Sequence, residues 1–259
     1  MRTLRYVLLT MLSVVAISGY SYSEENQDLL FQVSAINALL EGVYDGDISY
    51  GQLKRYGNFG IGTFNSLDGE MIGLEGKFYQ ITAQGLVNVV DDEMKTPFAV
   101  VTFFEPDRTV LLPETLDYGK LEEYLDRLLP TKNIFYAIKI EGVFEYVKTR
   151  SVPRQNKPYL PLIEVLKNQP TFEFRKIKGT VVGFRCPLYV TGINVPGYHL
   201  HFITEDRKAG GHLLECRLEN VRVEIDHTLQ FYMVLPEDVE FYKADLGKKK
   251  HQELEKVEK

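Results

Sequence analysis

The stretch from Gly197 to His212, GYHLHFITEDRKAGGH, has the pattern of two β-strands joined by a polar loop. Histidines and apolar residues alternate in its first half, and side chains at i and i+2 share one face of a strand, so His199 and His201 are expected to project together. The run TEDRKAGG is polar and ends on two glycines, which is typical of a loop between strands. His212 begins the next apolar segment, where a return strand is expected. Such a hairpin would bring three of the chain's five histidines to one point.

Three histidines at one point could hold a metal ion. A catalytic zinc site typically has three protein ligands and one open position, whereas a structural zinc site is closed by four ligands and often uses thiolates. The two cysteines, Cys186 and Cys216, are too far apart in the sequence to form a CxxC pair. Imidazole ligands suit Zn, Cu, Fe or Ni rather than Mg or Ca. The histidines therefore predict a transition-metal site with an open position.

Two other interpretations fit the same stretch. His199, His201 and Glu205 form the pattern HxHxxxE, which resembles the first metal-binding motif of cupins and would indicate a metal oxygenase or isomerase. Glu205 opens the charged run EDRK, however, where a carboxylate is ordinarily solvated, and the chain has no evident second cupin motif. In the third interpretation the histidines pack, or bind metal structurally, in an exported binding module without catalytic activity.

Short apolar and alternating runs recur along the chain and predict a sheet-rich fold. The run PFAVVTFFEP at 97–106 is nearly all apolar, which is typical of a central strand buried on both faces. Asp-Gly at 68–69 predicts a hairpin turn. Residues 116–129 carry leucines at helical spacing, which predicts one helix with a core-facing stripe. Because strands dominate, we expect an α+β fold with two β-sheet-containing domains, few helices and mixed sheets.

Changes in composition along the chain predict its domain organisation. The proline-rich segment 153–162 is the expected internal boundary. It separates an N-terminal mixed-sheet domain, residues 24–160, from a C-terminal zinc-binding β-rich domain, residues 161–259, which ends in a Lys/Glu-rich tail. Residues 1–23 combine a short basic start, an apolar core too short to span a bilayer comfortably, and small residues, which predicts a signal peptide. The mature protein is then periplasmic or secreted, and it is cytoplasmic if the signal is not functional.

Composition excludes some partners. The formal net charge is −6 and the basic residues are dispersed outside the tail, so neither a nucleic acid nor an anionic membrane surface is an expected partner. Export would permit a disulfide between Cys186 and Cys216. Both lie in expected strands, where each fits equally well as a small buried apolar residue, so the sequence leaves their state open.

Several separated blocks of the chain point to one known family. They are YDGDISYGQLKRYGNFGIGTFNSLDGEMIGLEGKFYQI, PFAVVTFFEPD, NIFYAIKIEGVFEYVKTRSVP, GTVVGFRCPLYVTGINVPGYHLHFITEDRKAGGHLLEC and the terminal ELEKVEK. Together they cover nearly everything after about residue 28, and the combination of GTFNSLDGE with GYHLHF and the later GGH is highly specific. On these residues the chain resembles the α-acetolactate decarboxylase family.

The resemblance implies an activity and a set of site residues. The activity is decarboxylation of 2-acetolactate to acetoin and CO2 by a homodimer, with Zn2+ as Lewis acid and no organic cofactor. The implied residues are the zinc ligands His199, His201 and His212, the catalytic residues Glu70, Arg150 and Glu258, and the pocket residues Thr63 and Arg150. Arg150 would bind the substrate carboxylate, and either Glu70 or Glu258 would protonate the enediolate to give one enantiomer. Glu255 and Glu253 match the family's C-terminal glutamate less well than Glu258 does.

Overall fold

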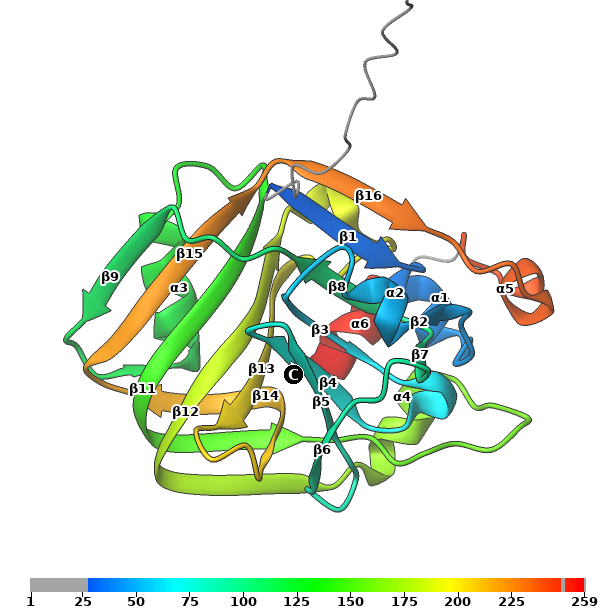
Figure 1. Ribbon diagram of the computed structural model, residues 1–259, viewed down its shortest axis with the longest axis horizontal. Coiled ribbons are helices and arrows are strands. Elements are labelled where there is room, and N and C mark those ends of the chain that lie inside the picture. Colours follow the sequence, from blue (N-terminus) through cyan, green and yellow to red (C-terminus); the bar gives the residue numbers. More distant parts are fainter. Residues whose placement is uncertain (1–27, 248–249, 259) are drawn as a thin grey trace, which may run out of the picture.

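Two seven-stranded β-sheets make up most of the protein, and Figure 1 shows them side by side. The structure, a computed structural model, describes residues 28–247 and 250–258. The predicted signal peptide lies outside the described residues. Within those ranges, no helix has the length and apolar character needed to cross a membrane. The predicted α+β class with few helices and mixed sheets is confirmed.

The first sheet is antiparallel except for the pairing of its edge strand β16 with β1. Its order is β16 (Gln230–Val234), β1 (Leu29–Val33), β8 (Ala99–Thr102), β3 (Phe59–Thr63), β4 (Glu70–Leu74), β5 (Lys77–Ile81) and β6 (Val87–Val89). Strand β8 comes from the apolar run predicted to be a central strand, and it lies between β1 and β3, buried along its whole length. A small separate sheet pairs β2 (Ile48–Ser49) with β7 (Lys95–Thr96).

The second sheet is antiparallel and curls on itself, because β14 pairs with both β13 and β11. Its order is β10 (Leu116–Asp117), β14 (Gly210–Leu218), β13 (Gly197–Thr204), β12 (Thr171–Cys186), β11 (Phe135–Arg150), β15 (Val221–Thr228) and β9 (Arg108–Leu112). The stretch from Gly197 to His212 forms β13, the polar loop after it and the start of β14, so the predicted hairpin is confirmed. The segment that ends at Arg150 is one continuous 16-residue strand, β11.

The helices are short. The predicted helix at 116–129 is α3 (Tyr118–Leu128), in which the Asp117 side chain caps the first turn by accepting the backbone N–H of Lys120, and Leu121 and Leu125 are buried. The others are α1 (Ile36–Leu40), α2 (Tyr50–Leu53), α4 (Leu162–Val165), α5 (Val239–Lys243) and α6 (His251–Glu258), with 3-10 turns at Asn65–Leu67, Leu166–Asn168 and Leu188–Val190.

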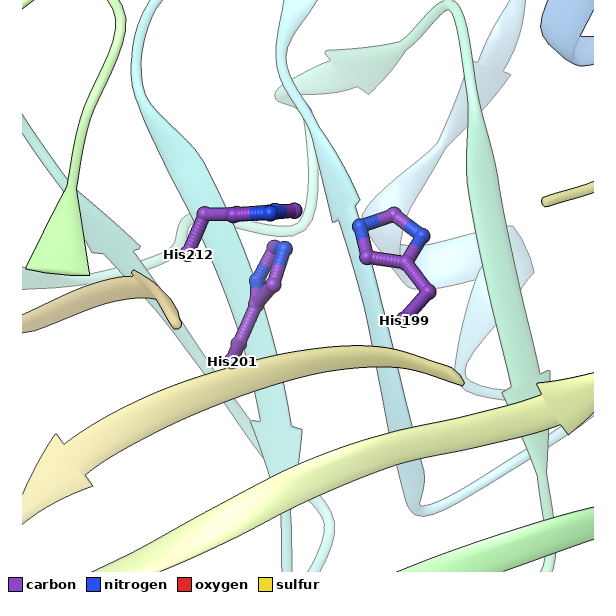
Figure 2. Close-up of side chains that lie close together, drawn as sticks. All are labelled: His199, His201 and His212. Atoms are coloured by element: carbon purple, nitrogen blue, oxygen red, sulfur yellow. The ribbon is translucent and has the colours of Figure 1, made fainter. Parts of the chain in front are cut away.

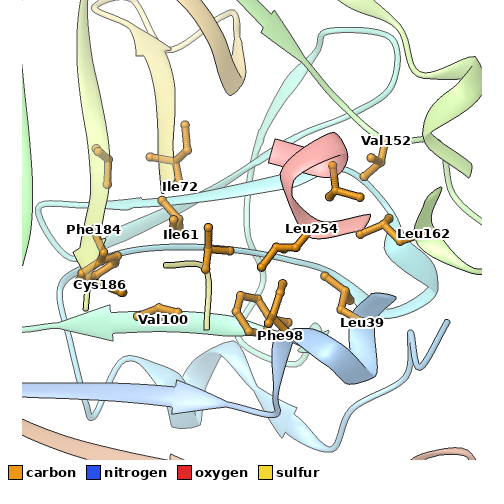
Figure 3. Packing of buried hydrophobic residues seen from close by; sticks show 14 of the residues in the cluster. Leu39, Ile61, Ile72, Phe98, Val100, Val152, Leu162, Phe184, Cys186 and Leu254 are labelled. Carbon is orange, nitrogen blue, oxygen red and sulfur yellow. The ribbon is translucent and has the colours of Figure 1, made fainter. Parts of the chain in front are cut away.

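A buried apolar core joins the two sheets. It contains Ile61 and Val100 from the first sheet, together with Phe184 and Cys186 at the end of β12 in the second (Figure 3). The C-terminal helix α6 also belongs to this core through Leu254. The two sheets and the chain's last helix therefore share one hydrophobic interior, which fixes their mutual position.

The sheets exchange strands across the predicted domain boundary at residue 160. Strands β9, β10 and β11 precede that residue but belong to the second sheet, while β16 follows it and belongs to the first. The division into domains at this residue stays a prediction. The functional side chains described below come from both sheets and from α6.

Candidate metal centre and active site

The three histidines of the stretch Gly197–His212 lie together in the interior. One ligand nitrogen from each of His199, His201 and His212 lies within 4.8 Å of the other two. Figure 2 shows the three imidazoles converging, and their ring centroids are 5.1, 5.1 and 5.3 Å apart. All three residues are buried. The group has the size and donor type of a three-histidine metal site.

Strand register explains this convergence. His201 of β13 lies directly opposite His212 of β14, and His212 in turn lies opposite Arg150 of β11. His199 is two residues before His201 on the same strand, so it shares the same face. Gly211 immediately precedes His212 with φ of 139°, and a Cβ there would lie 2.3 Å from the Arg150 carbonyl oxygen. Only glycine permits this close approach of β14 to β11.

The imidazole nitrogens are prepared for a metal ion. His201 Nδ1 is 2.9 Å from the carbonyl oxygen of Met71, so this nitrogen carries the proton and Nε2 presents a lone pair. His199 Nδ1, His201 Nε2 and His212 Nδ1 are buried and have no hydrogen-bond partner among the described residues. Burial lowers the pKa of His201 to about 3 and moves the pKa of the other two histidines well below the usual range, which keeps the rings neutral. Neutral imidazoles with orphaned nitrogens are what a metal ion requires.

The first sheet contributes a carboxylate and a hydroxyl. Glu70 begins β4 directly opposite Thr63 at the end of β3. Glu70 Oε1 accepts a hydrogen bond from Arg150 Nη1 at 2.9 Å, and its Oε2 lies 3.6 Å from His201 Nε2. Burial raises the pKa of Glu70 to about 7, although the Arg150 charge acts in the opposite direction. The Thr63 hydroxyl donates to the Gly69 carbonyl oxygen at 2.7 Å, which ties together the two ends of the turn.

The turn before Glu70 has a strained backbone. Ser66 and Leu67 have φ of 63° and 53°, in the left-handed region that non-glycine residues seldom occupy. The conformation is held from both sides, because Ser66 N–H donates to Tyr44 O and Gln155 N–H donates to Ser66 O, each at 2.7 Å. Leu67 is thereby directed to the wall of the pocket beside the histidines. Such strain persists only where the surrounding structure imposes it, which is typical of functional sites.

Arg150 lies at the junction of three elements. It is 4% exposed at the end of β11, and its Nη2 donates to the carbonyl oxygen of Val257 in α6 at 3.0 Å while Nη1 binds Glu70. Its Nε is buried and has no hydrogen-bond partner in the part of the chain that the structure describes. One edge of the guanidinium therefore still has a donor to offer within the pocket.

The C-terminal helix supplies the last polar group. Glu258 Oε2 lies 3.8 Å from Nε2 of both His199 and His212, and within residues 28–247 and 250–258 it has no hydrogen-bond partner. Burial raises the pKa of Glu258 to about 8, with Arg150 lowering it and Glu70 raising it further. Glu258 is thus the tail glutamate that reaches the histidines.

One cavity is lined by every site residue that the sequence predicted. The cavity is small, with a volume of about 40 Å³. The polar lining comes from His199, His201, His212, Glu70, Arg150, Glu258 and Thr63, and the apolar lining from Ile36, Leu39, Leu67, Phe98, Val152, Leu162 and Val257. The arrangement combines a potential metal site, one cation and two carboxyl groups inside apolar walls.

Other residues that the sequence raised lie elsewhere. Glu205 is 66% exposed and pairs with Lys178 at 3.2 Å, so the cupin-like ligand set with Glu205 is wrong. Glu253 pairs with Lys250, and Glu255 is exposed. Cys186 and Cys216 are both buried free thiols, in agreement with the apolar interpretation of each.

Sequence reasoning missed the backbone partners of the site. The carbonyl oxygens of Met71 and Val257 orient His201 and Arg150, and backbone atoms leave no mark in a residue pattern. The helix at the C-terminus was also missed, although Leu254 and Val257, spaced by three, were a signal for it within an otherwise charged tail.

Comparison with known proteins agrees with this site. Residues 30–248 match a family model described as alpha-acetolactate decarboxylase. The chain is 52% identical over 237 residues to the alpha-acetolactate decarboxylase of Methanosarcina mazei, which covers 92% of this chain and 82% of that protein. It is 48% identical to that of Methylococcus capsulatus, with 88% of each protein covered.

Solved structures give the same result. The crystal structure of alpha-acetolactate decarboxylase from Bacillus subtilis strain 168 superimposes with a TM-score of 0.86 at 42% identity, covering 89% of this chain and 98% of that one. A Staphylococcus aureus protein of unknown function, described as similar to alpha-acetolactate decarboxylase, superimposes with a TM-score of 0.84 at 30% identity. The chain therefore belongs to the alpha-acetolactate decarboxylase family of enzymes.

Proposed function

We propose that the protein converts 2-acetolactate to acetoin and CO2 at the cavity between its two sheets, with zinc held by His199, His201 and His212. The observation that carries this proposal is the meeting, in one small cavity, of three neutral imidazoles, a buried arginine, the buried carboxyl group of Glu70 and the largely buried one of Glu258. The names of the similar proteins indicate the substrate, and the side chains of the cavity give a physical reason for each step of its conversion.

The residues fit a zinc ion. The donor set is three buried neutral imidazoles, each with a nitrogen that has no hydrogen-bond partner, and His201 is oriented from behind by the Met71 carbonyl. Three protein ligands leave a position open to substrate, as catalytic zinc sites require. When bound, zinc would supply Lewis-acid stabilisation for negative charge that develops on the substrate's oxygen atoms.

Arg150 binds and orients the substrate carboxylate. Its Nη1 and Nη2 are held by Glu70 and by the Val257 carbonyl, so the guanidinium plane is fixed before substrate arrives. These bonds use two of the five guanidinium N–H groups, so three remain for the incoming carboxylate, including that of the unpartnered Nε. When the bond from the carboxylate carbon breaks, its electron pair passes into the neighbouring ketone and gives an enediolate, while CO2 leaves.

A proton must then reach the carbon that lost CO2. The two buried carboxyl groups of the site, Glu70 and Glu258, are the candidates, because burial raises the pKa of each toward or above neutrality. Their positions differ: Glu70 is paired with Arg150, while Glu258 has a free Oε2 and lies on the helix that closes the cavity. Delivery from a fixed side chain restricts the proton to one face and so gives a single enantiomer of acetoin.

The apolar walls keep water from competing. Leu39, Phe98 and Leu162 surround the polar groups and are themselves buried, so the charges within the cavity act in a low dielectric. A site without such walls would leave the enediolate open to protonation by solvent from either face.

The experiment measures acetoin and zinc on the same sample. The mature chain, loaded with zinc, is expected to release CO2 and form acetoin from 2-acetolactate in the absence of oxygen. His212→Ala is expected to lose both the zinc and the activity. His227→Ala is the matched control, since His227 lies outside the cavity and pairs with Asp107. Wild-type zinc content and turnover in the His212 variant would contradict the proposal.

Export and a homodimeric state remain predictions from the sequence. They are tested separately from the chemistry, by mapping the N-terminus of the mature protein in its native host and by measuring its mass in solution.

A further inference from the structure

The C-terminal helix α6 is docked at one end by a partly buried ion pair. Lys250, the residue before α6, has its Nζ 2.6 Å from Glu41 Oε1 and 2.9 Å from Glu253 Oε2. The Lys250 side chain is 7% exposed and that of Glu41 is 21% exposed. Pairs this far from solvent are screened much less than surface pairs.

Lys250 is a poor residue for starting a helix. Its carbonyl oxygen accepts the first helical hydrogen bond, from the Leu254 N–H at 2.9 Å, so Lys250 occupies the N-cap position. That position favours Ser, Thr, Asp or Asn, and positive charge at a helix N-terminus opposes the helix dipole. Helix stability therefore does not explain a lysine here, whereas the contact with Glu41 does.

Glu41 connects the pair to α1, which lines part of the cavity. It directly follows α1, whose Ile36 and Leu39 line the cavity. The pair between Glu41 and Lys250 thus joins the helix that forms one wall to the helix that closes the cavity. Figure 3 shows Leu254 of α6 against Leu39 and neighbouring apolar side chains.

Helix α6 carries two groups that the reaction uses. The Val257 carbonyl accepts a hydrogen bond from Arg150, and Glu258 faces His199 and His212. Both lie at the end of α6 opposite to Lys250. An eight-residue helix is rigid over this length, so fixing its first turn fixes the direction in which its last turn points.

We propose that Lys250 and Glu41 are positioning residues that hold α6 over the three-histidine centre and so place Glu258 and the Val257 carbonyl for the reaction. Neither side chain lines the cavity, and both act through the helix. The effect on turnover rests on the proposed function, whereas the docking of α6 does not.

The experiment compares variants by amide hydrogen exchange of residues 251–258 and by steady-state kinetics. Lys250→Met and the milder Glu41→Gln are expected to speed amide exchange in α6 and lower kcat about tenfold, with zinc content unchanged, since truncating a buried pair leaves its partner uncompensated. Lys256→Met is the matched control, because Lys256 is an exposed lysine of the same helix.

Two outcomes would overturn the proposal. One is α6 exchange in the Lys250 and Glu41 variants equal to that in the Lys256 control. The other is faster exchange with unchanged kcat, which would make the pair structural only. If the wild-type chain formed no acetoin, the proposed function would fail, while the exchange data would still decide whether the pair docks α6.

Discussion

Replacing Arg150 by lysine tests whether the shape of the guanidinium, and not only its charge, is needed. Arg150 donates to Glu70 from Nη1 and to the Val257 carbonyl from Nη2, and it keeps a buried unpartnered Nε. A lysine ammonium is a single point on a flexible stem and cannot hold two partners in a plane while offering a third donor to substrate. The variant keeps the positive charge and loses the fixed fork.

The expected loss follows from the contacts that disappear. A hydrogen bond to a charged group contributes about 1.5–3 kcal/mol, which corresponds to roughly 10- to 150-fold in kcat/KM when it is the bond to the substrate carboxylate. The buried Val257 carbonyl also loses its donor, which costs about 1–3 kcal/mol in the free energy of unfolding. Zinc content should not change, because all three histidine ligands remain.

The assay is acetoin formation at several substrate concentrations, with zinc content and urea unfolding measured on the same preparation. Arg154→Lys is the matched control, since Arg154 pairs with Asp68 at 3.1 Å but is 63% exposed, and exposed pairs contribute little. Two results would refute the reasoning: kcat/KM of the Arg150 variant within about twofold of wild type, or loss of zinc without loss of the fold.

Three further predictions concern separate features. Glu70→Gln and Glu258→Gln should each retain zinc. The variant that lacks the true proton donor should yield acetoin of reduced enantiomeric excess, measured by chiral gas chromatography. An enantiomeric excess equal to that of the wild type in both variants would exclude a carboxyl donor. Gly211→Ala should lower zinc stoichiometry and activity together, because its Cβ would lie 2.3 Å from the Arg150 carbonyl oxygen, and full zinc occupancy would contradict this. Asp226 is 2% exposed, and burial raises its pKa to about 7, so the folded state favours the neutral carboxyl group. The neutral group's contribution to the free energy of unfolding is fully present below about pH 4 and is lost as pH rises toward 7. Asp226→Asn should therefore raise the free energy of unfolding by about 1–2 kcal/mol more at pH 8 than at pH 5, which is less than the roughly 4 kcal/mol that the full pKa shift of Asp226 represents. Urea titrations that give equal effects of the substitution at both pH values would refute the assignment.

Local periodicity in the sequence was enough for most of the fold. The alternation around His199 predicted a strand and its return, and the leucine spacing of 116–129 predicted α3 with its buried face. Sheet membership could not be predicted in the same way. The pairing of β16 with β1 and the curl that brings β14 onto β11 join residues far apart in the chain, and their energy comes from burial that no local pattern encodes.

The site residues also differ in how far local sequence predicts them. His199, His201 and His212 could be grouped from their spacing, because one hairpin carries all three. Glu70 and Arg150 were ordinary strand-end charges until the family resemblance singled them out. Their contact across 80 residues depends on how the two sheets pack together.

The C-terminal helix shows why a charged tail can complete a buried site. Read alone, a Lys/Glu-rich end is solvated, and the apolar area of Leu254 and Val257 is small for an eight-residue helix that must lose its conformational freedom. Two polar contacts help to hold α6 in place: Lys250 to Glu41, and Arg150 to the Val257 carbonyl. The second lies in the cavity, so whatever occupies the cavity also changes how firmly α6 is held. Ligand in the cavity should therefore alter amide exchange in α6 even where it touches no atom of the helix's first turn, and exchange that stays the same with and without ligand would contradict this reasoning.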